Sequence, residues 1–247
     1  LLEHCRQHQA GFVLLSTSRV YSIPPLAGLQ VQTQEQAFVP ANNTLPHGVT
    51  ERGVSELFTT AAPVSLYGST KLASEQLALE YSHTFDFPVW INRCGVMAGA
   101  GQFGKADQGI FAFWLHCWCE ERGLKYIGFG GHGHQVRDCL HPHDLTDLLM
   151  RQMATECGSK PRIVNVSGGL KSARSLKQLS DWCGQRWSPQ KVASDNTPRT
   201  FDLPWVVLDH SLASETWGWQ PKITTDQVLD QIADFAETQP DWIEFSR

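Results

Sequence analysis

The 247-residue sequence has no apolar run long enough to cross a bilayer, no strongly basic stretch and no recognisable secretory signal. Its most apolar helix candidate, residues 109–119, is too short for a membrane span and contains His116. The net charge of −5 is also unlike the basic footprint of a nucleic-acid-binding protein. We therefore expect neither a membrane nor a nucleic acid as a partner.

A disulfide framework is missing as well. The seven cysteines are scattered along the chain without a regular spacing. Scattered cysteines are typical of reduced thiols, which persist in reducing compartments. This pattern predicts a cytoplasmic protein without disulfides.

The composition that is present is that of an ordinary globular protein, 41% hydrophobic and 18% charged, and the length allows a sizeable core. Apolar runs typical of buried strands alternate with stretches of helical composition, which indicates an α/β fold. The predicted strands are 12–15, 88–94, 124–129, 162–166 and 206–209. The predicted helices are 1–8, 72–81, 107–122, 143–156, 175–184, 211–217 and 225–238.

The most informative stretch is Tyr67-Gly-Ser-Thr-Lys71. Residues four apart lie on one face of a helix, so the phenol and the ammonium are neighbours. A free phenol titrates near pH ~10 and is a poor base at neutral pH, but a nearby ammonium favours the phenolate. Such a pair can take a proton from a substrate hydroxyl while a cofactor takes the hydride. The alternative is a packed tyrosine beside a solvated lysine, because this spacing also occurs by chance.

Hydroxyl residues follow the first predicted strand. The apolar run Phe12–Leu15 leads into Ser16, Thr17 and Ser18, and ligands bind at the carboxyl ends of strands in open α/β sheets. Thr17 is therefore a candidate hydrogen-bond partner for a reacting group; the alternative is a hydroxyl that satisfies local backbone. The proline-rich segment 23–63 separates Thr17 from Tyr67, and we expect it to be an irregular loop that borders the substrate.

Four segments carry a family resemblance, in order along the chain. They are Ser16–Tyr21 with its strand-end hydroxyls, Leu66–Glu75 with Tyr67 and Lys71, Gln135–Leu145 with V-R-D and H-x-x-D-L, and Trp217–Pro221 with G-W-x-P. Together they resemble the extended short-chain dehydrogenase/reductase family, the nucleotide-sugar epimerases and dehydratases. The resemblance covers nearly the whole chain.

This resemblance implies a Rossmann-like, doubly wound parallel sheet with a smaller α/β substrate-binding domain. Residues 1–96 would be the C-terminal half of the NAD-binding domain, with 23–63 as an insertion. Residues 97–247 would mainly bind substrate, with about 138–166 returning to the sheet. The family begins with a G-x-x-G-x-x-G turn that holds the cofactor pyrophosphate, and none precedes Thr17. We expect that on the order of a hundred residues of the natural protein precede Leu1.

The resemblance also implies NAD as the cofactor and gives each central residue a role. Tyr67 would be the general base and acid, Lys71 would favour the phenolate and bind the nicotinamide ribose, and Thr17 would hydrogen-bond the reacting sugar hydroxyl. The implied cofactor-binding residues are Ser16, Tyr67, Lys71, Arg93, Cys94 and Gly95.

A nucleotide-diphosphate sugar is the implied substrate. Arg137 would clamp its diphosphate through paired guanidinium donors; an ion pair with Asp138 or Asp144 is the alternative. Gln102, Phe103 and Gln108 lie in a glycine-rich stretch similar to one in the CDP-tyvelose 2-epimerases, although Ala100 and Gly101 replace that group's proline and arginine. The implied substrate-binding residues are Thr17, Ser18, Arg19, Gln102, Phe103, Gln108 and Arg137.

The residues after Thr17 bear on the reaction. Dehydratases of the family carry Asp-Glu at this place, and its decarboxylases usually keep the Glu, whereas this chain has Ser18 and Arg19. The resemblance therefore implies an epimerase, with CDP-hexose 2-epimerisation as the first hypothesis. Another nucleotide-sugar 4-epimerase, a reductase, a non-catalytic nucleotide-binding regulator and an inactive fragment stay open as alternatives.

Two further expectations concern metals and assembly. The histidines form two H-x-H pairs, at 132/134 and 141/143, but the family needs no metal, so no metal site is expected. In the family the helix with the Tyr–Lys pair commonly forms a dimer interface, which makes a homodimer an expectation for this chain.

Overall fold

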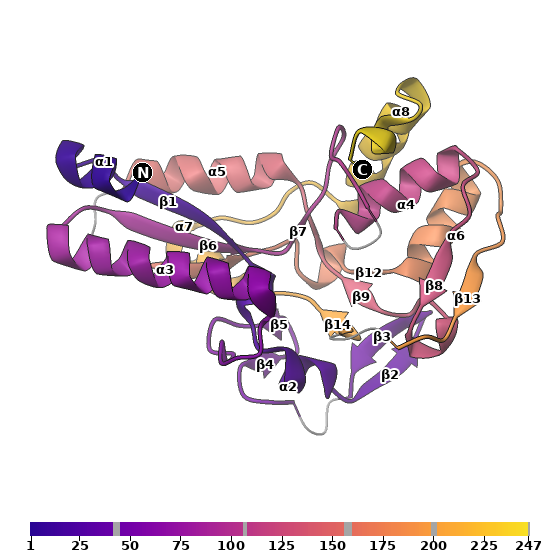
Figure 1. The fold of residues 1–247 in the computed structure, drawn as a ribbon, viewed down its shortest axis with the longest axis horizontal. Helices are drawn as coiled ribbons and strands as arrows, with labels where there is room; N and C mark the ends of the chain where they lie inside the picture. Colours follow the sequence, from indigo (N-terminus) through magenta and orange to yellow (C-terminus); the bar gives the residue numbers. More distant parts are fainter. Residues whose placement is uncertain (42–44, 106–107, 156–159, 199–201, 247) are drawn as a thin grey trace.

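Three parallel strands form the central sheet (Figure 1). In the computed structural model, which describes residues 1–41, 45–105, 108–155, 160–198 and 202–246, their order is β1 (Phe12–Thr17), β6 (Val89–Cys94) and β11 (Ile163–Val166). All three were predicted as strands. Within the described residues no strand pairs with the outer edge of β1. The mixed α/β fold with a parallel sheet is confirmed.

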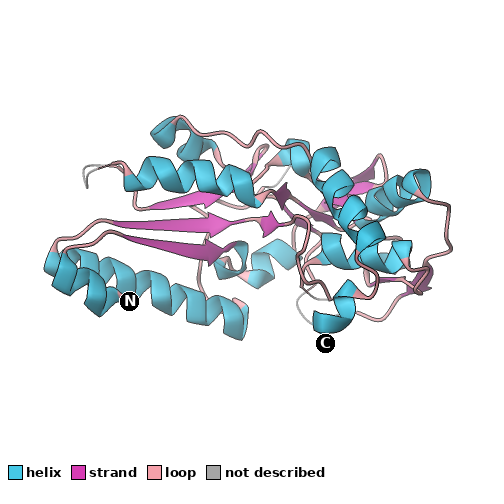
Figure 2. Ribbon diagram, turned by 90° about the horizontal axis from the view of Figure 1, so that it is seen from above, coloured by secondary structure: helices cyan, strands magenta, loops and turns pink. Residues whose placement is uncertain are grey.

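Helices cover both faces of this sheet (Figure 2). Side chains alternate between the faces of a strand, and β6 turns Val89 and Ile91 toward one face and Trp90 toward the other. The first face packs against α1 (Leu2–His8) and α3 (Ser65–Phe85), and the second against α5 (Pro142–Met153) and α7 (Ser211–Trp217). β6 is buried along its whole length on both faces, and it carries the buried polar residues Asn92 and Arg93 beside its apolar ones.

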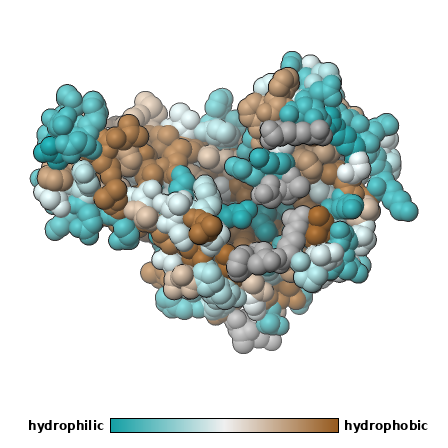
Figure 3. Space-filling model, viewed as in Figure 1, coloured by the Kyte–Doolittle hydropathy of each residue, from teal (hydrophilic) through white to brown (hydrophobic). Residues whose placement is uncertain are grey.

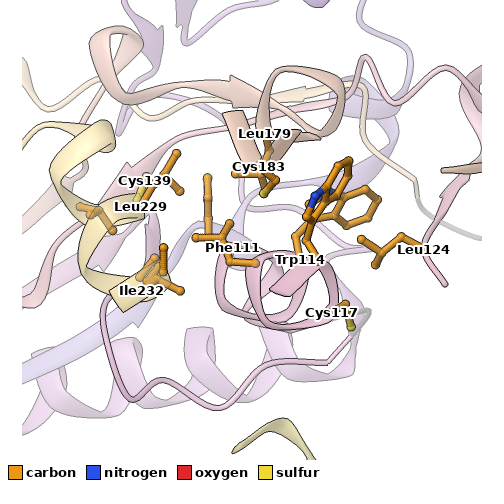
Figure 4. Close-up of a cluster of buried hydrophobic side chains, with 14 of the residues drawn as sticks. Phe111, Trp114, Cys117, Leu124, Cys139, Leu179, Cys183, Leu229 and Ile232 are labelled. Atoms are coloured by element: carbon orange, nitrogen blue, oxygen red, sulfur yellow. The ribbon is translucent and has the colours of Figure 1, made fainter. Parts of the chain in front are cut away.

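The second half of the chain builds a separate core around α4 (Ile110–Cys119), α6 (Leu176–Arg186) and α8 (Thr225–Thr238). Figure 4 shows Phe111, Trp114 and Leu179 among the side chains that meet there. The short strands of the second half of the chain are β7 (Val96–Met97), β8 (Lys125–Ile127), β9 (Val136–Arg137), β10 (Cys139–Leu140), β12 (Arg174–Ser175), β13 (Ala193–Asp195) and β14 (Trp205–Val206).

The segment 23–63 was wrongly predicted as irregular. Its described part holds α2 (Ile23–Ala27), the hairpin β2 (Val31–Gln34) and β3 (Ala37–Pro40), and the short pair β4 (Val49–Thr50) and β5 (Gly53–Val54). The two prolines at the start of α2 stand in its first turn, where a missing N–H costs no helical hydrogen bond. The prolines therefore did not exclude structure.

Several predicted boundaries move. The helix predicted at 107–122 is α4, which starts only after Gly109 because that residue is left-handed at φ 71°; Asp107 lies outside the described residues. The strands predicted at 124–129 and 206–209 shrink to β8 and β14. α7 and α8 match their predicted bounds, and capping boxes begin both α6 and α8.

Three further facts concern the described residues. No helix among the described residues is long and apolar enough to cross a membrane. On the face in Figure 3, apolar side chains gather in the left half, where Figure 1 places β1 and α3. The cysteines in the described part of the chain form no disulfide; Cys157 lies outside it.

Candidate active site

Thr17 stands at the carboxyl end of β1 and begins the short 3-10 helix η1 (Ser18–Val20). Its side-chain oxygen accepts a hydrogen bond from the backbone N–H of Arg19 at 3.2 Å. A hydroxyl that accepts one bond through its oxygen still has its own proton to donate. Thr17 can therefore satisfy the local backbone and also donate to a bound group, so both of its predicted roles are compatible.

Tyr67 and Lys71 lie in the first turns of α3. The Tyr67 side chain is 53% exposed, and the Lys71 Nζ lies 6.0 Å from the centre of its ring. The same Nζ donates a hydrogen bond to the carbonyl of Leu15 at 3.1 Å. Lys71 thus places its Nζ near the phenol ring while it links α3 to β1.

Gly68 explains how α3 approaches the end of β1 so closely. A Cβ atom at this position would overlap with the carbonyl oxygen of Arg19. Only glycine lets the helix backbone pack directly on η1. Because Gly68 is next to Tyr67, this approach brings the phenol-bearing turn to the strand end that carries Thr17.

Ser16 and Arg93, both predicted to bind cofactor, direct their side chains elsewhere. Ser16 donates a hydrogen bond to the carboxylate of Glu75, and the Arg93 guanidinium donates to the same carboxylate, with Nη2 to Oε2 at 2.7 Å. All three residues are buried, and Glu75 is fully so. Any contact of Ser16 or Arg93 with a cofactor would therefore come from the backbone.

Cys94 and Gly95 end the central strand. Burial raises the pKa of the Cys94 thiol to about 12, which keeps it protonated at neutral pH. Gly95 donates its backbone N–H to Val166, and a Cβ atom there would meet the carboxylate of Asp138. As predicted candidates for cofactor contact, these two residues offer backbone rather than reactive side chains.

Asp138, which the sequence offered only as a possible ion-pair partner of Arg137, is buried. Its carboxylate accepts hydrogen bonds from the Ser167 hydroxyl and from the backbone N–H of Leu208 at 3.0 Å. Burial raises the pKa of Asp138 against the effect of these donors. The V-R-D motif was the only sequence signal that pointed near it.

The predicted phosphate and sugar ligands lie at several places. Ser18 and Arg19 form η1 itself, with Arg19 exposed. Arg137 on β9 donates to the carbonyls of Val136 at 2.7 Å and Leu203 at 3.0 Å. These bonds hold the guanidinium beside β9. Asp138 accepts from Ser167 and also feels the charge of Arg137, whereas Asp144 accepts from the backbone N–H of Ile223.

The stretch after β7 holds the remaining candidates. Gln102 donates its amide to the carbonyl of Met97 at 2.8 Å, and its buried Oε1 has no partner. Phe103 is 51% exposed and stacks on Trp242 with ring centres 4.9 Å apart. Gln108 is exposed and pairs through its backbone with Lys105. Gln102 thus has an acceptor to offer, whereas Phe103 already has an aromatic partner.

A cavity of about 210 Å³ lies between α4 and β8. Its walls are mainly apolar and aromatic, with Lys125 and Gln135 as polar groups. Gln135 lies two residues before Arg137 along the chain. The lining residues are Ile110, Phe113, Trp114, Gly123, Leu124, Lys125, Ile127, Gln135 and Leu176.

The histidine pairs are arranged as ring contacts. His132 stacks near His134 with ring centres 5.6 Å apart, and His141 meets His143 edge-on at 5.1 Å. No group of three or more metal-ligating side chains comes together in the described residues.

Comparison with known proteins assigns this chain to a family. The sequence model of the NAD dependent epimerase/dehydratase family matches residues 1–167. The chain belongs to this family. The family is NAD-dependent, and the described residues fit the nicotinamide–ribose side of that cofactor. Lys71 uses one of its three N–H donors on Leu15, which leaves two for a ribose.

Two family members illustrate the likeness in sequence. The CDP-paratose 2-epimerase of Salmonella typhi is 26% identical over 96% of this chain and 69% of its own length. A dTDP-glucose 4,6-dehydratase of Xanthomonas campestris pv. campestris is 25% identical over 75% of this chain, and the match spans only 53% of that enzyme.

Solved structures show the shared fold. The dTDP-glucose 4,6-dehydratase from Bacillus anthracis, crystallised with NAD, has a TM-score of 0.70 at 18% identity and covers all of this chain and 68% of its own. The UDP-glucuronic acid 4-epimerase from Bacillus cereus, with UDP-glucuronic acid and NAD, has a TM-score of 0.67 at 21% identity and covers 96% and 65%.

Glu75 is the residue of this site that sequence reasoning missed. It stands four residues after Lys71, on the same helix face, and Arg93 lies in a strand that is buried throughout. A cation in a buried strand requires an anionic partner. That requirement was the available signal, but the sequence did not say which carboxylate meets it.

Proposed function

We propose that this protein is an NAD-dependent nucleotide-diphosphate-sugar epimerase that acts by transient oxidation of a sugar hydroxyl. CDP-hexose 2-epimerisation is the specific reaction proposed. The observation that carries the proposal is the close approach of α3 to η1 at Gly68, which brings Tyr67 and Lys71 to the strand end of Thr17.

NAD, when bound, would supply reversible hydride-transfer chemistry at the sugar carbon. Tyr67 and Lys71 are the side chains proposed to hold its nicotinamide ribose, with backbone at Ser16, Arg93, Cys94 and Gly95 beside it. The two free N–H donors of Lys71 suit the vicinal hydroxyls of a ribose.

The proposed proton chemistry belongs to Tyr67 and Thr17. Tyr67 as phenolate takes the proton of the reacting hydroxyl and gives it back after the configuration has inverted. The Lys71 ammonium, 6.0 Å from the ring centre, stabilises that phenolate. Thr17, whose oxygen already accepts from Arg19, donates a hydrogen bond to the sugar oxygen and so orients it for Tyr67.

The composition of η1 favours epimerisation over dehydration. Elimination of water needs an acid and a base beside the sugar in addition to the Tyr–Lys pair, and η1 offers Ser18, an exposed Arg19 and an apolar Val20. The likeness to the Salmonella CDP-paratose 2-epimerase over 96% of this chain supports the 2-epimerase among the alternatives.

The cavity between α4 and β8 is the proposed place of the nucleotide base. Phe113 supplies an aromatic wall, and Lys125 and Gln135 supply polar groups that can recognise base edges. Arg137, two residues after Gln135, is the proposed clamp on the diphosphate. Gln102 and Gln108 are proposed sugar contacts. A homodimer through α3 stays a prediction; Leu66 and Leu77, 90% and 53% exposed, are apolar side chains it could bury.

The test is Tyr67→Phe in the full-length protein, with Tyr81→Phe farther along α3 as the matched control. We expect kcat with CDP-paratose to fall about 10²–10⁴-fold in Tyr67→Phe, while the Kd of the nucleotide sugar changes by no more than about threefold. Tyr81→Phe should keep wild-type turnover. Retention of near-wild-type kcat in Tyr67→Phe would remove Tyr67 from the reaction, and inversion at C4 instead of C2 would favour the 4-epimerase alternative.

A further inference from the structure

A buried polar network lies directly under the proposed catalytic residues. It consists of Ser16, Tyr21, Glu75, Arg93 and Asn165, which are all buried. Glu75 accepts from Ser16 and from Arg93, Arg93 reaches the Tyr21 hydroxyl at 3.5 Å, and Tyr21 donates to Asn165 at 2.6 Å. This network of five side chains connects α3 with all three strands of the sheet.

The strand register explains how the network forms. Ser16, Arg93 and Asn165 are direct neighbours across β1, β6 and β11. Neighbours in register on parallel strands point to the same face, and here that face is covered by α3. The polar row stands one residue before the strands end, so it lies immediately beneath the level of Thr17.

Glu75 is the point where the helix joins this row. It lies four residues after Lys71 on the same face of α3. Lys71 binds the carbonyl of Leu15, and Glu75 binds the hydroxyl of Ser16, so successive turns of the helix are attached to successive residues of β1. Gly68, one turn earlier, packs on Arg19. These three contacts fix both the height and the rotation of α3 against the strand end.

We propose that Ser16, Glu75 and Arg93 are positioning residues, which hold the Tyr67–Lys71 turn in its reactive placement beside Thr17. The inference rests on the proposed function. Arg93 is needed because a carboxylate as buried as Glu75 requires a cationic partner, and Tyr21, whose ring lies 5.2 Å from the guanidinium carbon, supports that partner from the other side.

The sheet provides a matched control on its other face. Asn92 precedes Arg93 on β6, is equally buried, and exchanges two hydrogen bonds of 2.8 Å with Gln152 on α5. These two hydrogen bonds join β6 to α5 and involve neither α3 nor the end of β1. The removal of this amide pair should therefore leave turnover unchanged.

The decisive experiment compares two double variants in the full-length protein. One combines Glu75→Leu and Arg93→Met, and the other combines Asn92→Leu and Gln152→Leu. Replacing both partners of a buried pair by apolar groups of similar shape is often close to neutral for stability. We expect Tm near that of the wild type in both. Only the Glu75/Arg93 variant should lose kcat, on the order of 10–100-fold, with the KM for nucleotide sugar within a factor of about 3.

Ser16→Ala separates the anchor from the charge pair, because it removes the hydroxyl bond to Glu75 and leaves Arg93 paired. It should lower kcat by a smaller factor than the double variant does, with Tm again near that of the wild type. A Glu75/Arg93 double variant with both kcat and Tm at the wild-type level would overturn the proposal, since the network would then serve only to stabilise the fold.

Amide hydrogen exchange of residues 69–75 gives a readout that needs no substrate. Exchange in these turns of α3 should be faster in the Glu75/Arg93 double variant than in the Asn92/Gln152 double variant at equal Tm. Equal exchange in the two variants contradicts positioning. If the wild type converts no nucleotide sugar, the proposed function fails, and the exchange comparison still decides whether the network holds α3 in place.

Discussion

The two faces of β6 carry buried polar pairs of different kinds on consecutive residues. On the α5 face, Asn92 and Gln152 exchange two neutral amide hydrogen bonds and close on each other. On the α3 face, Arg93 forms an ion pair with Glu75 that extends to Ser16 and Tyr21. Both pairs join a helix to the same strand at nearly the same height.

The two pairs are therefore equally buried without having an equal role. A neutral amide pair joins its helix to the sheet at a small desolvation cost, whereas a buried ion pair carries a large one and is often no more stabilising than apolar packing. The charged pair stands on the face where the Tyr67–Lys71 turn meets Thr17. We therefore interpret the amide pair as an element of stability and the charged pair as an element of site geometry.

Removing one member of the charged pair should have the largest effect on stability. Arg93→Met leaves the Glu75 carboxylate buried without its cation, and we expect the free energy of unfolding to fall by about 3–5 kcal/mol. Urea unfolding of the full-length protein measures this loss. A loss below that of Asn92→Leu would show that the carboxylate finds another partner or takes up a proton, and the contrast between the faces would disappear.

Alkaline pH should weaken the charged face through Tyr21. Burial raises the pKa of Tyr21 to about 12, above its ordinary value of 10.0. Its contribution to stability is therefore complete below pH 10 and is lost as the pH rises toward 12, by up to about 3 kcal/mol. Tyr21→Phe should unfold with a shallower pH dependence between 10 and 12. Parallel pH curves for the two proteins would contradict this.

The approach of α3 to η1 can be tested with a single methyl group. Gly68→Ala would place a Cβ atom against the Arg19 carbonyl, while Gly123→Ala adds one where no atom lies within 4 Å. We expect Gly68→Ala to lose about 1–3 kcal/mol of stability through overpacking, with Gly123→Ala close to the wild type. Thermal unfolding compares the two, and equal Tm values would show that α3 can move away without loss.

The amide pair should give a stability loss no larger than that of Gly68→Ala. Asn92→Leu leaves the Gln152 amide without its partner, and we expect a loss of about 1–3 kcal/mol in the free energy of unfolding. Turnover of the folded protein should stay at the wild-type level. A fall in kcat at unchanged Tm would show that this face also positions the site.

Much of the fold follows from local signals in the sequence. The strand candidates 88–94 and 162–166 predicted β6 and β11, and Thr224 and Gln227 form the capping box that begins α8. The prediction that residues 23–63 are irregular was wrong because the β2–β3 pairing depends on contacts that local composition does not encode. Phe38, for instance, donates its backbone N–H to the carbonyl of His134.

The candidate site was predicted as a set of residues, not as an arrangement. Thr17, Tyr67 and Lys71 could be named from motif and order, because each stands at a strand end or a helix start. The partner of Arg93 could not be named, since both Glu75 and Glu80 lie on α3 and only the fold selects Glu75. The same holds for Ser16, whose hydroxyl faces α3 because of its position in the strand alternation.

The central claim is that the sugar is oxidised and reduced at one carbon without exchange with solvent. The most direct test supplies the full-length protein with CDP-paratose deuterated at C2, in ordinary water, and follows the label by NMR and mass spectrometry. Transient oxidation predicts an inverted product that keeps its deuterium at C2, because the same hydride is removed and returned. Loss of the label to water during inversion would contradict the account.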